Sequence, residues 1–369
     1  MTKKEGLRCV AFLLVVCLLL IGMTDIFEMD FADYARRFYS YRCLEKNTVD
    51  AVYIGTSGVG RYWLGAKAYD EYGMTVYPLS VDAMPVWLFP IMMDEALAYH
   101  NPQLMIFDAR AFGQGHSAEN ADVGARRVLD SMEFFSANRI NAAMKTMEMV
   151  HRLDDSKPAF DLSYIFSFMK FHTQWSEKDF SIDTQYDKQK HEFGGYHIGF
   201  LLSVLHEPQT PMEYDEDYYV PLDPISEEAL YEVLNHAKEL GVQTLFVDSP
   251  QFISKTEMGR ANTLRKILQE QGATYISYNT PNAAEELNVQ MNPETDYYDE
   301  AHVNFYGAEK FTASLAAYLD QHYDLPDRRN EETVRKDWDG VYDHIKKTVK
   351  DYEAVHKEQG TLKTASGGE

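Results

Sequence analysis

The chain has 369 residues, of which 35 are lysine or arginine and 58 are aspartate or glutamate, so its net charge is −23 at pH 7. This acidic balance argues against nucleic acid as a partner, because a polyanion binds to basic surfaces. With 45% hydrophobic and 25% charged residues, the composition is that of a folded protein and excludes wholesale disorder. The length fits one large domain or two ordinary ones.

The first 24 residues have the pattern of an export or membrane-anchor signal. Lys3, Lys4 and Arg8 precede sixteen uncharged residues, 9–24, which is near the short end of the roughly 17 to 25 residues that span a bilayer. The basic flank predicts a cytoplasmic N-terminus, so residues 1–24 are interpreted as the uncleaved signal anchor of a single-pass cell-membrane protein whose main domain is extracytoplasmic. The alternatives are a cleaved signal peptide, for which residues 22–24 offer a poor cleavage site, and a buried helix.

Beyond the anchor, residues 25–48 mix aromatic and charged side chains and are interpreted as a juxtamembrane stalk or helix. Short apolar runs then alternate with helical patterns, which predicts a parallel sheet. Five strands with helices between them fit a flavodoxin-like three-layer sandwich, an α/β fold. The predicted strands are residues 49–54, 75–79, 103–107, 244–248 and 273–277.

The alternation stops between about residues 116 and 222, where long helical patterns and an aromatic, histidine-rich stretch replace it. A crossover between parallel strands needs only about a dozen residues, so this segment is predicted to be a helical insertion in the α/β domain of residues 49–325, forming a cap or side lobe. A last helix of the domain is expected at about residues 307–318. Residues 326–369 are expected to form a charged helix and a disordered tail. One apolar face of that helix combines Val334, Trp338, Val341, Ile345, Val349 and Tyr352.

Ser57 follows the first predicted strand, in the sequence Gly55-Thr56-Ser57-Gly58. A serine on a sharp turn between a strand and a helix lies at the carboxyl edge of a parallel sheet, where open α/β folds hold their active sites. Asp299 and His302 lie between the last strand and the last helix, so we expect them at the same edge. The carboxylate can then orient the imidazole, and the imidazole can act as general base toward the serine. The alternatives are an ordinary turn at Ser57 and an aspartate that only caps the coming helix.

The two motifs together resemble the SGNH (GDSL-type) hydrolase superfamily: Gly-Thr-Ser57 after the first strand, and Asp299-x-x-His302 followed by Val-Asn-x-x-Gly before the last helix. More narrowly, the chain is similar to the membrane-anchored bacterial members that accompany cell-surface polymer acylation, such as the alginate O-acetylation and teichoic acid D-alanylation proteins. The resemblance covers about residues 50–112 and 226–319. It implies Ser57 as nucleophile, His302 as base and Asp299 as the residue that orients it, with no cofactor.

The chain departs from that family at the oxyanion site. The family usually supplies a glycine after the second strand and an asparagine after the third, whereas residues 79–83 read Leu-Ser-Val-Asp-Ala and residues 107–110 read Phe-Asp-Ala-Arg. The remaining candidate donors are the backbone at Ser57 and Gly58, and Arg110. The alternative for Arg110 is an ion pair with Asp108 or a surface position. Losing one oxyanion donor typically costs about 10² to 10³ in turnover.

The insertion contributes two further candidates, His172 and Trp175, which either line the mouth of a pocket or pack in the ordinary way. No metal site is predicted, because His191, Glu192 and His197 lack the His-Glu-x-x-His spacing of a zinc protease. The acidic run 213–217 lacks the glycine and terminal glutamate of a calcium loop.

These observations predict an extracytoplasmic serine esterase or O-acyltransferase that acts on acyl esters of a cell-surface polysaccharide through an acyl-enzyme. The sequence does not distinguish between water and a sugar hydroxyl as the acceptor of the acyl group. The expected partners are the glycan or acylated polymer, the membrane, and a membrane-bound O-acyltransferase. The alternative is a catalytically weak scaffold or glycan-binding module with the same fold.

Overall fold

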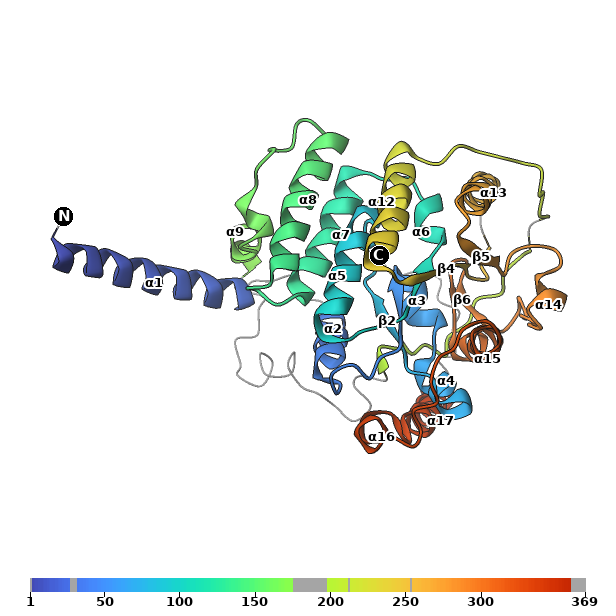
Figure 1. Cartoon of the computed structure of the whole chain (residues 1–369). Coiled ribbons are helices and arrows are strands. Elements are labelled where there is room, and N and C mark those ends of the chain that lie inside the picture. The colour runs from blue at the N-terminus through green and yellow to red at the C-terminus, as the bar shows by residue number, and fades with distance from the viewer. Residues whose placement is uncertain (1, 27–31, 175–197, 212, 253, 360–369) are drawn as a thin grey trace.

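The computed structural model describes residues 2–26, 32–174, 198–211, 213–252 and 254–359, and its centre is one sheet of five strands (Figure 1). All neighbouring strands are parallel, in the order β2-β1-β3-β4-β5. This is the flavodoxin-like order, so the predicted fold class is confirmed, and each predicted strand ends within two residues of an observed one. The strands are β1 (Ala51–Gly55), β2 (Val76–Ser80), β3 (Leu104–Asp108), β4 (Gln243–Asp248) and β5 (Thr274–Ser277).

Strands β1, β2 and β3 are covered on both faces, which explains why their sequences are continuous apolar runs. Every residue of β1, β2 and β3 is buried, as expected for a parallel sheet with helices on both sides. Residue Ala51 of β1 lies opposite Val76 of β2 and Leu104 of β3, so the strands are in step. Their carboxyl ends therefore meet at one edge of the sheet.

Helices cover both faces of the sheet (Figure 1). One face carries the helices that directly follow β1 and the long helix after β5, which pack on one another. The other face carries the helices that precede β3, β4 and β5. The first set is α3 (Ser57–Tyr62), α4 (Gly65–Tyr72) and α15 (Phe305–His322), and the second is η1 (Val86–Leu88), α5 (Phe89–Tyr99), α12 (Pro224–Leu240) and α13 (Lys255–Glu270).

The segment predicted as an insertion begins with helices that extend the second face sideways. Helix α7 packs on α8 and on α2, and α8 packs on α5, so these helices lie beside the sheet. Residues 199–211 and 213–222, which contain no helix or strand, lead back toward α12. The helices that follow β3 are α6 (Arg110–Gly113), α7 (Ala118–Ser131), α8 (Ala137–Leu153), η2 (Leu162–Tyr164), α9 (Phe168–Phe171) and η3 (His172–Gln174).

Residues expected to form a stalk include a helix of the folded domain, α2 (Ala32–Cys43). Tyr34, Phe38 and Tyr41 are buried, and their spacing of four and three residues places them on one helix face. That face packs on β2 and α7. The stalk interpretation is therefore wrong for residues 32–43, because the aromatic side chains pack in the core.

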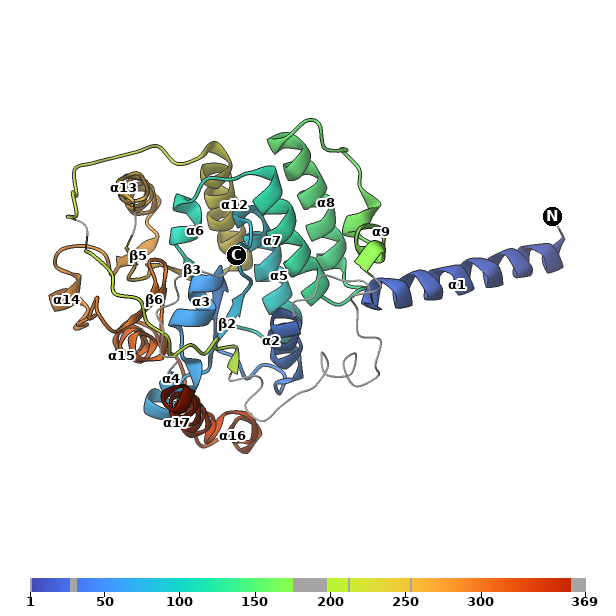
Figure 2. The same ribbon diagram turned by 180° about the vertical axis from the view of Figure 1, so that it is seen from behind.

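One helix, α1 (Lys3–Ile26), is long and apolar enough to cross a membrane, by length and composition. It projects from the domain (Figures 1 and 2). Eight of its large apolar side chains are more than half exposed, whereas Thr24 near its end is buried.

The charged C-terminal segment docks on the first helical layer as two helices, where the sequence predicted one. Helix α16 (Glu332–Trp338) ends before Gly340, whose φ of 74° breaks the helix, and α17 (Val341–Gln359) follows and packs on α4. Trp338 is buried, and its ring centroid lies 5.4 Å from that of Tyr69 in α4. The remaining buried residues of the predicted face are Val334, Val341, Ile345 and Val349. The tail predicted to be disordered, 360–369, lies outside the described residues.

Replacing Trp338 with alanine should lower the free energy of unfolding by about 3 to 5 kcal/mol, because the side chain is 1% exposed and its loss leaves a cavity against Tyr69. Denaturant unfolding of the full chain in detergent measures the change. Tyr352→Ala, at a position 47% exposed on α17, is the matched control and should change stability by about 0.5 kcal/mol or less. Equal losses in the two variants would contradict the docking of α16.

Candidate active site

Ser57 is the first residue of α3, directly beyond a tight turn at the carboxyl end of β1. The turn requires glycine at position 55, because a Cβ there would lie 2.3 Å from Asp108 Cβ and 2.6 Å from Val59 Cγ2. Thr56 donates from its backbone N–H and its hydroxyl to Asp108 Oδ2, at 3.3 and 2.7 Å. The end of β3 thereby fixes the residue that precedes Ser57.

Asp299 and His302 lie opposite each other in a small antiparallel hairpin formed by β6 (Tyr297–Asp299) and β7 (His302–Val303). Residues directly opposite in such a pair project to the same face. Ala301, in the turn between them, donates its N–H to Asp299 Oδ1 at 2.8 Å. Two short strands and a two-residue turn therefore hold the carboxylate beside the imidazole.

The fold brings these three predicted residues together at the carboxyl edge of the sheet. The distance from Ser57 Oγ to His302 Nε2 is 2.7 Å. On the other side of the ring, His302 Nδ1 lies 2.9 Å from both carboxylate oxygens of Asp299. When Nδ1 carries the proton and donates it to Asp299, Nε2 is free to accept the proton of the Ser57 hydroxyl. This is the geometry of a nucleophile with its general base and the orienting group of that base.

The pKa of the Asp299 carboxyl is lowered from its ordinary value. Burial acts to raise this pKa, but the hydrogen bond from His302, the charge on its ring and the N–H of Ala301 lower it by more. The carboxylate therefore stays charged under conditions in which an ordinary aspartate begins to protonate. A charged Asp299 stabilises the imidazolium that forms when His302 accepts a proton.

Arg110 and Tyr62 hold the turn of the hairpin. Arg110 donates from Nη1 to the Ala301 carbonyl at 2.8 Å, and the Tyr62 hydroxyl lies 3.1 Å from the same oxygen. Arg110 Nε is buried and has no hydrogen-bond partner among the described residues. The ion pair between Arg110 and Asp108, given above as the alternative, is not among the contacts of the described residues: Arg110 donates to the Ala301 carbonyl, and Asp108 accepts from Thr56. One nitrogen of Arg110 is thus committed to the backbone between Asp299 and His302.

The remaining candidates for oxyanion donors lie at the start of α3. The first N–H groups of a helix have no partner within it, and Ser57 and Gly58 occupy these positions. The Arg110 guanidinium is close, since Nη1 would lie 3.8 Å from a Cβ built on Gly58. At the end of β2, Ser80 accepts a hydrogen bond from the fully buried Arg37 at 2.9 Å. The sequence reasoning missed Arg37 because it assigned residues 32–43 to a stalk.

The returning limb of the insertion borders the site. Leu201 donates its N–H to the Gly60 carbonyl of α3 at 2.7 Å, and Phe305 donates to the Ser203 carbonyl at 2.7 Å. Glu207 donates to the Tyr297 carbonyl of β6 at 2.9 Å. The insertion therefore meets α3 and the β6–β7 hairpin through backbone hydrogen bonds.

His172 does not join the site. It is exposed in η3, its Nδ1 lies 3.1 Å from the Phe168 carbonyl, and α9 lies on the side of the domain next to α1, away from β6 (Figures 1 and 2). The prediction of His172 at the pocket mouth is wrong because the helices of the insertion pack sideways on α2 and α5. Trp175, His191, Glu192 and His197 lie outside the described residues.

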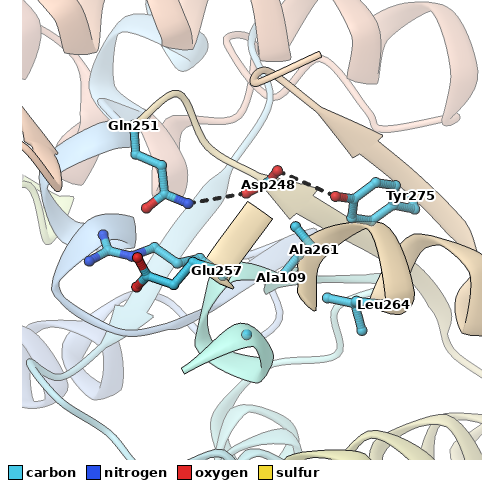
Figure 3. Close-up of a pocket in the computed structure, with 9 residues that line it drawn as sticks. Ala109, Asp248, Gln251, Glu257, Ala261, Leu264 and Tyr275 are labelled. Carbon is cyan, nitrogen blue, oxygen red and sulfur yellow. Dashed lines mark hydrogen bonds between the residues drawn. The ribbon is translucent and has the colours of Figure 1, made fainter. Parts of the chain in front are cut away.

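A small cavity lies on the other side of Arg110, at the carboxyl ends of β3 and β4 (Figure 3). Its free volume of about 10 Å³ is close to the least that one water molecule needs. Asp248 in its wall accepts hydrogen bonds from Gln251 and Tyr275 (Figure 3), and burial raises the pKa of its carboxyl. Arg110 lines this cavity and also contacts the hairpin turn, so the cavity adjoins the site. Among the residues the structure describes, no group of three or more His, Cys, Asp or Glu side chains is arranged to hold a metal ion.

No protein-family model matches the chain, and a search of curated proteins finds no match to it.

Asp299→Asn should remove a contribution to stability that depends on pH. The pKa of the Asp299 carboxyl is lower in the folded chain than its ordinary value near 3.9. The stabilisation by Asp299 is therefore complete when the pH is well above 3.9, and it is lost as the pH falls through the pKa that Asp299 has in the folded chain. The unfolding midpoints of the wild type and the variant should therefore stay apart above about pH 5 and converge as the pH falls further, through the lowered pKa of the folded chain. Thermal unfolding at stepped pH measures this, with Glu300→Gln in the same turn as control. A difference that is constant or widens on acidification would contradict the lowered pKa.

Arg110→Ala should loosen the hairpin, because the Ala301 carbonyl loses its charged donor. We expect faster amide hydrogen exchange over residues 297–303, and a smaller effect in Arg110→Lys, which keeps a donor. Arg260→Ala is the matched control, since Arg260 Nη1 donates to the Gly113 carbonyl of α6 and not to the turn. Unchanged exchange in Arg110→Ala would show that Arg110 does not position the hairpin.

Proposed function

We propose that the chain is a membrane-anchored, extracytoplasmic serine esterase or O-acyltransferase of the SGNH type, acting on acyl esters of a cell-surface glycan. The observation that carries this proposal is the hydrogen-bonded series Ser57, His302 and Asp299, with distances of 2.7 and 2.9 Å. The order of the series along the chain and its place at the carboxyl edge agree with the sequence resemblance. The glycan and the acyl transfer come from that resemblance alone.

The proposed reaction has two halves. In the first, His302 Nε2 takes the hydroxyl proton of Ser57 while Oγ attacks the ester carbonyl, and the oxyanion forms beside the N–H groups of Ser57 and Gly58. The tetrahedral intermediate expels the alcohol, which takes the proton from His302, and leaves the acyl group on Ser57. In the second, His302 deprotonates water or a sugar hydroxyl, which attacks the acyl-enzyme carbonyl. The bond from the acyl carbon to Ser57 Oγ then breaks, Oγ takes the proton back from His302, and the acid or the new sugar ester is released.

The proposed location depends on α1. An apolar helix with Lys3, Lys4 and Arg8 at its start and none of its central stretch buried would span the bilayer with the basic end in the cytoplasm. The domain, including the triad, would then lie outside the cell. A membrane-bound O-acyltransferase is the partner that this arrangement suits.

A second candidate function is a catalytically weak scaffold or glycan-binding module. It is favoured by the ends of β2 and β3, where Ser80 binds Arg37 and Asp108 binds Thr56, so neither place offers the donor that the family uses. The two candidates differ in whether Ser57 turns over an ester.

Ser57→Ala should lower the turnover of a small activated ester by about 10⁴-fold or more, because the nucleophile is lost and an activated leaving group makes little demand on the oxyanion site. Ser203→Ala is the matched control, since Ser203 lies beside the site but contacts Phe305 through its backbone carbonyl. Hydrolysis rates and thermal unfolding of the full chain are measured together.

If the wild type and Ser57→Ala are both inactive toward every ester and acyl donor tested, and both still bind glycan, the enzyme proposal fails and the scaffold proposal replaces it.

A further inference from the structure

The exposed apolar side chains of the domain gather on the segment 132–173, here called the helical lobe. It contains α8, η2, α9, the first two residues of η3 and the links between them. Outside α1, seven large apolar side chains other than tyrosine are exposed among the described residues, and six belong to this lobe. An exposed apolar surface on a folded domain marks an interaction site. The six are Phe135, Ile140, Met144, Phe160, Leu162 and Met169.

The helical lobe lies where α1 meets the domain. Helix α1 packs against α9, and both views place α8 and α9 beside the C-terminal end of α1 (Figures 1 and 2). Thr24, at the end of the apolar stretch, is 4% exposed, whereas Leu19 is 62% exposed. The lobe therefore adjoins α1 at the level where an apolar span ends and a bilayer surface would begin.

The charge of the lobe differs from that of the rest of the chain. Residues 132–173 contain five acidic and five basic residues, so the whole net charge of −23 resides elsewhere. Bilayers that contain anionic lipids have a negative surface potential, which repels acidic protein surfaces. The lobe is thus a part of the domain that can approach such a surface without electrostatic cost.

From these three observations we infer that the helical lobe rests on the outer surface of the bilayer that α1 spans, with Phe135 and Phe160 in the headgroup region. The inference rests on the proposed anchoring of α1. The occupant of the apolar surface is lipid, because the surface adjoins the end of the span. Elements β6 and α15 lie toward the side of the domain remote from α1 (Figure 2), so the hairpin that carries Asp299 and His302 would lie on the side of the domain away from the membrane.

The test uses the full chain in vesicles of phosphatidylethanolamine and phosphatidylglycerol. Cys9, Cys17 and Cys43 are changed to serine, and one cysteine is placed at Phe135 or Phe160, which are 81% and 59% exposed. Each carries an environment-sensitive fluorophore, and lipids with a spin label in the headgroup or upper acyl chain act as quenchers. The matched control is Tyr219→Cys, at a position 51% exposed outside the lobe.

We expect lipid quenching at positions 135 and 160 to exceed that at position 219 several-fold. Equal quenching at all three positions, in protein that resists alkaline carbonate extraction, would overturn the inference while leaving the anchor intact. Shielding of the labels that requires added membrane proteins would overturn it in favour of a protein partner. Release by carbonate would overturn the anchoring and this inference together. Ester turnover in the same vesicles reports separately on Ser57.

Discussion

The hydrogen bond between Ser57 Oγ and His302 Nε2, 2.7 Å long, joins two parts of the chain that are 245 residues apart in sequence. This bond requires that the local structure fix the positions of both residues. On one side, β1 ends at Gly55 and Asp108 fixes Thr56. On the other, the β6–β7 pairing sets Asp299 opposite His302. The parallel sheet connects the two supports because the carboxyl ends of its strands share one edge.

Arg110 links these supports, since it begins α6 after β3 and donates to the turn between Asp299 and His302. Its guanidinium therefore helps to hold the turn that carries Asp299 and His302, and so positions the proposed general base. The proposed oxyanion site then consists mainly of backbone N–H groups at Ser57 and Gly58. Such a site suits acyl donors with good leaving groups, because losing one donor costs about 10² to 10³ in turnover.

Local patterns in the sequence predicted much of this structure. Strands β1, β2 and β3 are wholly buried and therefore continuous apolar runs. The alternation of short apolar runs with helical patterns also predicted β4 and β5, which are only partly buried. The Gly-Thr-Ser57 and Asp-x-x-His302 motifs each lie within one short segment. Contacts between distant segments were not predictable. The apolar face of α2 fits a stalk as well as a core helix until β2 is placed beside it. Similarly, Arg110 donates to a backbone carbonyl. Every residue has such a carbonyl, so this partner cannot be identified from the sequence.

The central claim is that Ser57 is an activated nucleophile, and covalent labelling by a fluorophosphonate probe tests it most directly. The account predicts a single adduct, located on Ser57 by mass spectrometry, that forms on the folded full chain and is lost in His302→Ala. An unmodified Ser57 in folded protein, or equal labelling of the wild type and His302→Ala, would contradict the account.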